Sequence, residues 1–372
     1  MKIVVIPDKF KGTLSSREAG EAIRRGIIEV MPLSSVKCIS VADGGDGTVE
    51  AYLSSVGGKR KYLEVCGPNF KPIRACYAVL PCGRAVIEMA QSSGMGVAEP
   101  GSNPVFTTSY GVGELIKDAM DEGCREIIVG IGGSATNDGG VGMAAALGAR
   151  FLNSNGEDIE PSGGGLSSLS RIDLGGFDPR VASTKFLVAC DVDNPLCGEN
   201  GAAAVFAPQK GASAEDVVLL DKNLRHFAQT VKSFVGVDLL EIKGGGAAGG
   251  LGAGLKAFCG AELTSGTELL LDTVEFEKET ADADLIVTGE GSFDSQSLGG
   301  KLPLGISRRS GGTPVAIIAG RVELSEEEIK KAGFFAAIES AERGLSFDKI
   351  KKTAAEDLKN AAIRLAKMIK NV

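Results

Sequence analysis

The chain has little of several residue types on which common catalytic mechanisms depend. It contains no tryptophan, and aromatic residues make up only 5% of its 372 residues. It has a single histidine, His226, which lies within a helical pattern at 217–231, away from every glycine-rich segment. This scarcity excludes most histidine-based mechanisms and any zinc site built from several histidines.

An excess of positive charge and long apolar runs are also missing. The formal net charge is −8, which argues against a nucleic-acid-binding surface. No apolar run approaches the ~18–20 residues that span a bilayer, and the first apolar stretch is too short for a signal peptide. The eight cysteines include no Cys-x-x-Cys pair, which favours reduced, mostly buried thiols. We therefore expect a cytoplasmic protein with neither a membrane nor a nucleic-acid partner.

The alternation of apolar runs with helical patterns predicts an α/β fold. Runs of strand length lie near both ends of the chain, at 2–6, 36–41, 285–288, 315–319 and 334–338. Between residues 61 and 89, short strand-like segments separated by glycine and proline indicate hairpins instead. We expect a doubly wound parallel-sheet domain built from residues 1–60 and 281–372. Residues 61–280 would then form a second, inserted α/β domain containing a mixed sheet.

Glycine is abundant, with 52 residues, and three segments combine it with acidic or hydroxyl side chains. They read DGGDGT at 43–48, GIGGSATNDGG at 130–140 and GEGSFD at 289–294. Glycine lets backbone N–H groups approach an anion closely, and a helix that starts there adds a favourable dipole. We expect all three segments to be loops that hold a phosphate ligand together with a divalent cation.

Other polar segments follow expected strands and belong to the same prediction. Asp8, Lys9 and Lys11 follow the first strand, and Asp191, Asp193 and Asn194 follow a strand at 185–190. The carboxyl ends of parallel strands gather at one edge of a sheet, where α/β proteins bind ligands. Glycine loops, lysines and carboxylates are what phosphoryl transfer requires, and none of these roles needs histidine.

Structural alternatives and two other functions stay open at this point. The Asp-Gly segment could be an ordinary turn, residues 191–195 a turn and helix cap, and the lysines near residue 10 a solvated surface. A P-loop signature is absent, and loose dinucleotide fingerprints at 130–135 and 244–249 are expected by chance in so glycine-rich a chain. A nucleotide-dependent oxidoreductase and a non-catalytic sensor of a phosphorylated metabolite are therefore the alternatives to a kinase.

Ordered blocks along nearly the whole chain resemble the bacterial glycerate kinase family, the type unrelated to P-loop kinases. The blocks are PDKFKG at 7–12, ADGG at 42–45, IEMA at 87–90, GGSATNDGG at 132–140, CDVDNPL at 190–196, PQKGA at 208–212, GAAGGLG at 246–252 and TGEG at 288–291. The resemblance implies ATP-dependent phosphorylation of D-glycerate with magnesium, 2-phosphoglycerate as the favoured product, and a two-domain α/β protein. The chain departs from the family pattern at Lys9, Asp46 and Ser292, where serine, glutamate and a basic residue are expected.

Chemistry suggests a role for each candidate residue. Backbone N–H groups of 132–137 would hold a phosphate or the substrate carboxylate, a lysine would balance phosphate charge, and Asp191 is our first choice of base. The expected catalytic residues are Asp191, Lys9, Lys11 and Asp43. The expected substrate- or phosphate-binding residues are Asp8, Gly132, Gly133, Ser134, Asn137, Asp138, Asn194, Gly289 and Gly291. The expected metal ligands are Asp46, Glu290 and Asp294.

The same interpretation names the partners. D-glycerate would be the small-molecule substrate, with ATP and magnesium as cofactors, in a cleft between the two domains. We expect the domains to close over the substrate and exclude water. Assembly into a homo-oligomer is left open.

Overall fold

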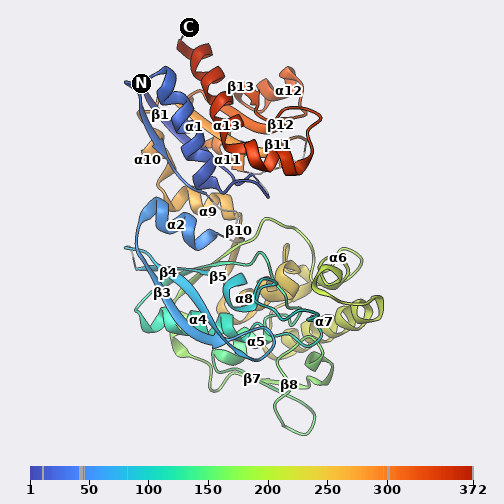
Figure 1. Ribbon diagram of the computed structural model, residues 1–372. Coiled ribbons are helices and arrows are strands. Elements are labelled where there is room, and N and C mark those ends of the chain that lie inside the picture. Colours follow the sequence, from blue (N-terminus) through green and yellow to red (C-terminus); the bar gives the residue numbers. More distant parts are fainter. Residues whose placement is uncertain are drawn as a thin grey trace. The chain divides into compact units, whose positions relative to one another are not determined.

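The computed structural model describes residues 1–10, 12–41, 45, 47–81, 83–295, 297–299 and 302–370. Three of the expected site residues, Lys11, Asp43 and Asp46, lie outside the described residues. The chain divides into two compact units (Figure 1). Unit 1 comprises Met1–Ala42, Glu50–Val56 and Thr267–Val372, and unit 2 comprises Asp43–Val49 and Gly57–Gly266.

Unit 1 contains a parallel sheet flanked by helices. Its elements are β1 (Lys2–Pro7), α1 (Ser16–Val30), β2 (Ser35–Cys38), most of α2 (Thr48–Val56), α9 (Gly266–Thr273), α10 (Phe276–Thr280), β11 (Leu285–Phe293), η6 (Ser297–Gly299), α11 (Leu302–Arg309), β12 (Val315–Val322), α12 (Glu326–Lys331), β13 (Phe334–Glu339) and α13 (Phe347–Lys370). The five strands follow the order β13-β12-β11-β1-β2 and all pair in parallel. This is the doubly wound order whose winding direction reverses between the first strand and its neighbour, here between β1 and β11.

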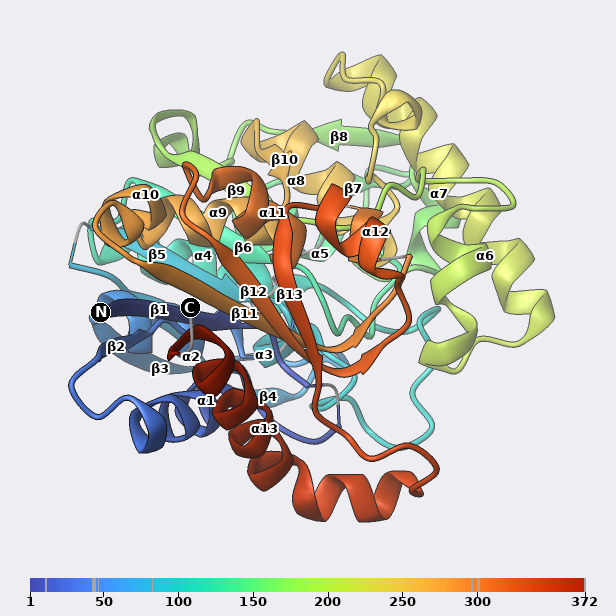
Figure 2. The ribbon, with the colours of Figure 1, turned by 90° about the horizontal axis from the view of Figure 1, so that it is seen from above.

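Helices cover both faces of this sheet because its strands alternate buried side chains between the two sides. Ile3 and Val5 of β1 belong to one buried cluster with residues of α1 and α13, which lie side by side on that face (Figure 2). Val4, whose side chain points to the opposite face, is equally buried, and α11 contacts β11 and β12. α1 and α13 approach so closely that a Cβ on Gly26 would lie 2.3 Å from the Lys359 carbonyl oxygen.

Unit 2 contains a mixed sheet and most of the loops. Its elements are β3 (Lys59–Cys66), β4 (Pro72–Val79), β5 (Arg84–Glu88), α3 (Ala90–Ser93), α4 (Tyr110–Asp121), β6 (Glu126–Gly130), α5 (Val141–Ala146), β7 (Arg150–Leu152), η1 (Gly165–Ser168), β8 (Arg171–Asp173), η2 (Pro179–Ser183), β9 (Lys185–Ala189), α6 (Ala202–Phe206), η3 (Pro208–Lys210), α7 (Ala214–Phe234), η4 (Leu239–Glu241), η5 (Ala247–Gly250), α8 (Leu251–Cys259) and β10 (Glu262–Thr264). The six-stranded sheet has the order β10-β9-β6-β5-β4-β3, with β4 antiparallel to both neighbours and the other pairs parallel. β7 and β8 form a separate antiparallel pair.

The expected fold class is confirmed: one sheet is wholly parallel and doubly wound, and the other is mixed. The hairpin expected between residues 61 and 89 is the antiparallel β3–β4–β5 meander. His226 lies in α7, where its Nε2 is 2.6 Å from the Leu169 carbonyl oxygen, as a helix residue with a packing partner. No helix among the described residues is long and apolar enough to cross a membrane.

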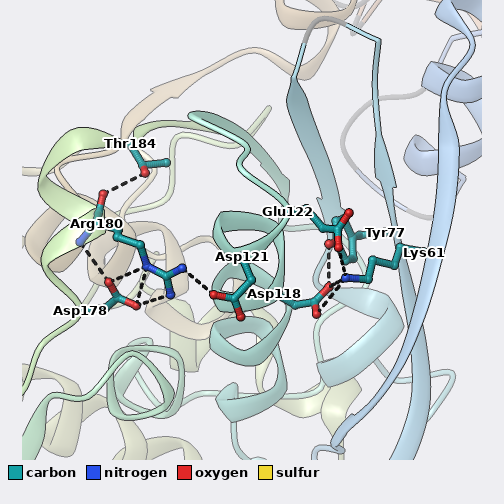
Figure 3. A network of polar contacts seen from close by, with 8 residues as sticks. All are labelled: Lys61, Tyr77, Asp118, Asp121, Glu122, Asp178, Arg180 and Thr184. Atoms are coloured by element: carbon teal, nitrogen blue, oxygen red, sulfur yellow. Dashed lines mark hydrogen bonds and ion pairs between the residues drawn. The ribbon is translucent and has the colours of Figure 1, made fainter.

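A polar network ties the end of α4 to three neighbouring elements of unit 2, which are β3, β4 and η2. Its members are Lys61, Tyr77, Asp118, Asp121, Glu122, Asp178, Arg180 and Thr184 (Figure 3). Three acidic side chains near the C-terminal end of a helix oppose the helix dipole, so they need cations nearby. Lys61 of β3 pairs with Glu122 at 2.6 Å, and Arg180 of η2 pairs with Asp121. The helix end is thereby held to β3, β4 and η2.

Candidate functional site: two sheet edges

The reversal point of the unit 1 sheet brings the segment after β1 beside β11. Pro7 pairs with Gly289 in the parallel register, and the Asp8 N–H donates to the Gly289 carbonyl at 2.7 Å. The Asp8 carboxylate accepts the Lys9 backbone N–H at 2.6 Å. Because doubly wound sheets bind ligands where the strand order reverses, this edge is the candidate site of unit 1.

The segment GEG at 289–291 lies inside β11, so our expectation of a loop there is wrong. Pairing with β12 continues through Ser292 and Phe293. A Cβ on Gly289 would lie 2.5 Å from the Ile318 carbonyl oxygen, so glycine here serves close contact between strands rather than a turn. Glu290 is only 5% exposed at this position. The expected loop is reduced to the residues that follow Phe293.

Asp294 begins that shorter loop. Its Oδ1 accepts the Ser297 N–H at 3.3 Å, and its Oδ2 accepts the Ser292 hydroxyl at 3.4 Å. Within the described ranges, no group of three or more His, Cys, Asp or Glu side chains is arranged to hold a metal ion. The metal-binding role expected of Glu290, Asp294 and Asp46 stays a prediction.

In unit 2, four parallel strands end at one level. Residues aligned across the strands are Glu88 of β5, Gly130 of β6, Ala189 of β9 and Thr264 of β10. The glycine-rich segment after β6 and the acidic segment after β9 therefore leave the same edge of the sheet, as expected. This edge holds Gly132, Gly133, Ser134, Asn137, Asp138, Asp191 and Asn194.

The glycine-rich loop is held rigidly by buried hydrogen bonds to Asp138. The Asp138 carboxylate accepts hydrogen bonds from the backbone N–H and the hydroxyl of Ser109 at 2.8 and 2.7 Å. It also accepts the N–H groups of Gly140 and Gly142 at 3.1 and 3.2 Å. Complete burial raises the pKa of Asp138, while these hydrogen bonds act in the opposite direction. The carboxylate thus anchors the loop to the starts of α4 and α5, and its expected role in ligand binding stays a prediction.

The neighbouring residues of the loop are also buried, but they differ in whether their polar groups form hydrogen bonds. The Ser134 side chain is 7% exposed, and the Gly133 carbonyl accepts the Met95 N–H at 2.9 Å. Asn137 is 0% exposed, and neither Nδ2 nor Oδ1 of its side chain forms a hydrogen bond with another described residue. Buried polar groups are normally satisfied, so this amide is a candidate for binding a ligand.

Sequence reasoning missed two buried charged residues at this edge. Lys210 is 6% exposed, and its Nζ donates to the Thr136 carbonyl at 2.7 Å. Burial lowers the pKa of Lys210 to about 7, although the charge of Asp138 acts to raise it. Glu88, 2% exposed, accepts the Val49 N–H. A lysine directly before a glycine is typical of a surface turn, whereas a carboxylate that ends the apolar run 85–87 could have been noticed.

The acidic segment after β9 is more open. Asp191 is exposed, and its Oδ1 accepts the Gly266 N–H at 3.1 Å. Asp193 pairs with Lys243 at 3.0 Å on the surface. The Asn194 amide donates to the Asn200 carbonyl at 2.9 Å, which fixes the turn. An exposed carboxylate at a strand end suits the proton acceptor that we expected of Asp191.

The described candidate residues therefore form two groups. Those of unit 1 are Asp8, Lys9, Gly289, Glu290, Gly291 and Asp294, and those of unit 2 are Gly132, Gly133, Ser134, Asn137, Asp138, Asp191 and Asn194. Each group is gathered at the carboxyl edge of its own sheet. Convergence of the two groups on one reaction centre stays a prediction.

Comparison with known proteins identifies the family. The model of the glycerate kinase family matches residues 3–370, nearly the entire chain. The chain belongs to the glycerate kinase family. This kinase family membership confirms both the resemblance of the sequence blocks and the expectation of an enzyme.

Relatives of this glycerate kinase family member cover 86% to 100% of its length. It is 44% identical over 368 residues to a glycerate kinase of Halalkalibacterium halodurans, covering 98% of this chain and 97% of the relative. It is 46% identical over 324 residues to the glycerate 2-kinase of Escherichia coli, covering 86% and 85%. A crystal structure of a protein described as glycerate kinase 2, from Salmonella typhimurium LT2, superposes with a TM-score of 0.89 at 42% identity, covering 100% and 98%.

Proposed function

We propose that the protein transfers the γ-phosphoryl group of ATP to D-glycerate, with magnesium, and that the acceptor is the 2-hydroxyl. The observation that carries this proposal is the family match over residues 3–370, which includes every described candidate residue at both sheet edges. The 2-position is favoured because a relative 46% identical to this chain is a glycerate 2-kinase. The reaction forms a bond between the acceptor oxygen and the γ-phosphorus and releases ADP.

The unit 2 edge supplies anion binding and proton transfer in this proposal. Backbone N–H groups of residues 132–137 hold the substrate carboxylate or a phosphate, assisted by Ser134 and the Asn137 amide, which lacks a partner among described residues. Asp191 accepts the proton of the attacking hydroxyl, which its exposed carboxylate allows. Asp138 and Asn194 maintain the two segments through their hydrogen bonds.

The unit 1 edge supplies phosphate and metal binding. Lys9 or Lys11 balances phosphate charge, and Asp8, Gly289 and Gly291 place backbone groups near it. Glu290 and Asp294 of this edge, together with Asp46 of the 43–48 segment, are the carboxylates for magnesium, which neutralises phosphate charge when bound. Asp43 of that same segment is a candidate for binding magnesium or for orienting the attacking hydroxyl. Magnesium commonly takes one or two protein carboxylates together with phosphate oxygens and water, so this donor set fits it without a closed cluster of ligands. One reaction centre that uses both edges, in a cleft, completes the proposal.

A coupled assay of ADP formation tests the activity. We expect ADP to form from ATP only when D-glycerate and magnesium are both present, with other small hydroxy acids as comparison substrates. Absence of D-glycerate-dependent ADP would overturn the proposal and reopen the sensor alternative. Absorbance change with NAD or NADP would instead favour the oxidoreductase.

Phosphorus NMR of the product separates the two possible hydroxyls. A phosphate on the 2-oxygen is attached to a carbon with one hydrogen, so its proton-coupled resonance is a doublet. A phosphate on the 3-oxygen is attached to a CH₂ group and gives a triplet. A triplet would retain the kinase and refute the 2-position.

A further inference from the structure

Asn137 is held from both sides by buried contacts. On its N-terminal side, the Thr136 carbonyl accepts Lys210 Nζ at 2.7 Å. On its C-terminal side, the Asp138 carboxylate accepts four hydrogen bonds, including two from Ser109. The residue between these anchors is 0% exposed, and both polar atoms of its amide lack a hydrogen-bond partner among the described residues. The backbone on both sides of Asn137 is thus held in place, while its side-chain amide is available to bind a ligand.

Lys210 reaches Thr136 because η3 and the following turn leave it little freedom. η3 starts at Pro208 and ends at Lys210, and Gly211 follows with φ +98°. A Cβ on Gly211 would lie 2.3 Å from the Ser102 carbonyl oxygen, so the turn is packed against that segment. The backbone geometry of η3 and Gly211, together with the hydrogen bond to Thr136, therefore positions Lys210 against the loop.

Burying a lysine costs free energy that a single hydrogen bond to a carbonyl does not require. A neutral donor would satisfy Thr136 without the cost of desolvating an ammonium group. Asp138 is the charged residue that acts on Lys210 in the part of the chain that the structure describes, and its carboxylate is already bound by four protein donors. Among the described residues, Lys210 Nζ donates one hydrogen bond, to the Thr136 carbonyl, whereas an ammonium can donate three. Its charge is thus available to an anion at the loop.

We infer that Lys210 is a positioning residue: it holds the 136–137 peptide so that the Asn137 amide binds an anionic group, and its positive charge favours that anion. The inference deepens the proposed function and rests on it. The anion is either the carboxylate of the acceptor or a phosphate of the nucleotide, since both offer the same oxygen acceptors to an amide N–H.

Steady-state kinetics of three Lys210 variants test the assignment. Lys210→Met removes donor and charge, Lys210→Gln retains a donor without charge, and Lys210→Arg retains both. We expect Lys210→Met to raise KM roughly 10- to 100-fold for one anionic substrate, Lys210→Gln to raise it less, and Lys210→Arg to restore part of the loss. The KM that rises, for D-glycerate or for ATP, identifies the source of the anion. Lys222→Met, an exposed lysine of the same unit, is the matched control and should behave as wild type.

Calorimetry supplies a readout that a purely structural role would not alter. Because burial holds the pKa of Lys210 at about 7, the free protein at pH 8 carries it mostly neutral, and a nearby anion should return a proton to it. Binding of D-glycerate, and separately of ADP, is measured in two buffers of different ionisation enthalpy. We expect proton uptake with one of these ligands in the wild type and its loss in Lys210→Gln. Unchanged KM values and unchanged proton uptake in the variants would overturn the inference, whereas an inactive wild type would overturn the proposed function.

Discussion

Single residues decide how the glycine-rich loop of unit 2 behaves. Asp138 and Lys210 are both buried ionisable groups, and burial shifts each towards its neutral form. Glycine gives a backbone more conformational freedom than any other residue does. In the folded chain the opposite holds, because Asp138 accepts four protein donors and Lys210 binds the Thr136 carbonyl. Rigidity at this loop comes from Asp138 within the glycine motif and from Ser109 and Lys210 outside it.

Lys210 should make stability depend on pH above neutrality. Its pKa is lowered from 10.5 to about 7 in the folded protein. Between these values the unfolded chain holds the proton and the folded chain does not, so the free energy of unfolding rises with pH across that window. Urea unfolding at pH 7 and pH 9.5 measures this rise. Lys210→Met should be more stable than wild type at pH 7 and should flatten the dependence; an equally steep rise in the variant would contradict this explanation.

Asp191→Asn tests the proposed base. The expected loss in kcat is about 10²- to 10⁴-fold, the usual contribution of a general base. The unfolding temperature should change little, because the Asp191 side chain is exposed to solvent. Asp193→Asn is the matched control, since this exposed carboxylate pairs only weakly with Lys243 across the surface. Near-normal turnover in folded Asp191→Asn would refute the role.

At the scale of elements, most strands and helices could be predicted from the sequence, but the strand that contains the GEG segment at 289–291 could not. The apolar runs at 2–6 and 315–319 are β1 and β12, because continuous burial on both faces requires continuous apolar sequence. The GEG segment combines glycine with an acidic side chain, which predicts a loop that holds phosphate and a cation. Its place within β11 depends on β12, whose Ile318 carbonyl leaves no room for a Cβ at Gly289. That contact is invisible in the sequence.

Gly289→Ala should therefore destabilise unit 1. The added methyl would lie 2.5 Å from the Ile318 carbonyl oxygen, so the strands must separate. We expect a loss of about 1–3 kcal/mol in the free energy of unfolding, as for other overpacked sites. Gly96→Ala is the control, because nothing lies within 4 Å of a Cβ there. Chemical denaturation of both variants decides; equal stability would mean that β11 and β12 adapt without cost.

The polar network at the end of α4 should contribute modestly and in a salt-dependent way. Arg180 pairs with Asp121 and with Asp178, and its side chain is 33% exposed. Solvent screening at that exposure limits the expected loss in Arg180→Ala to about 1 kcal/mol or less. Arg180→Lys should recover part of it, although it cannot keep the bidentate contact with Asp178. The unfolding curves of wild type and Arg180→Ala should differ at low salt and converge at high salt. A loss of stability that does not depend on salt would point to packing instead.

At the scale of the whole molecule, two units are built from interleaved stretches of one chain. After the second strand of unit 1 the chain enters unit 2 at Asp43–Val49, returns to unit 1 at Glu50–Val56, and then forms the rest of unit 2 before unit 1 resumes at Thr267. The similarity between the first and last sections of the sequence predicted a domain made from both termini. The domain boundaries expected at residues 60 and 280 stay a prediction, which limited proteolysis can test.

Closure on ligand binding is the prediction that belongs to this scale. If both sheet edges serve one reaction, ATP and D-glycerate together should draw the units into a more compact arrangement. Small-angle scattering should then give a smaller radius of gyration with both ligands than with either alone. L-glycerate is the matched control ligand. Identical profiles under all conditions would refute closure.

The sequence by itself determined the fold class, the family and which strand ends carry polar chemistry. It could do so because apolar periodicity, turn residues and ordered motifs are local properties of the chain. Only the tertiary structure decided that GEG is strand, that Asp138 is an internal anchor, and that Lys210 lies against Thr136. These facts depend on contacts between residues far apart in the chain, where burial sets the cost of every charge and removes the room for a side chain.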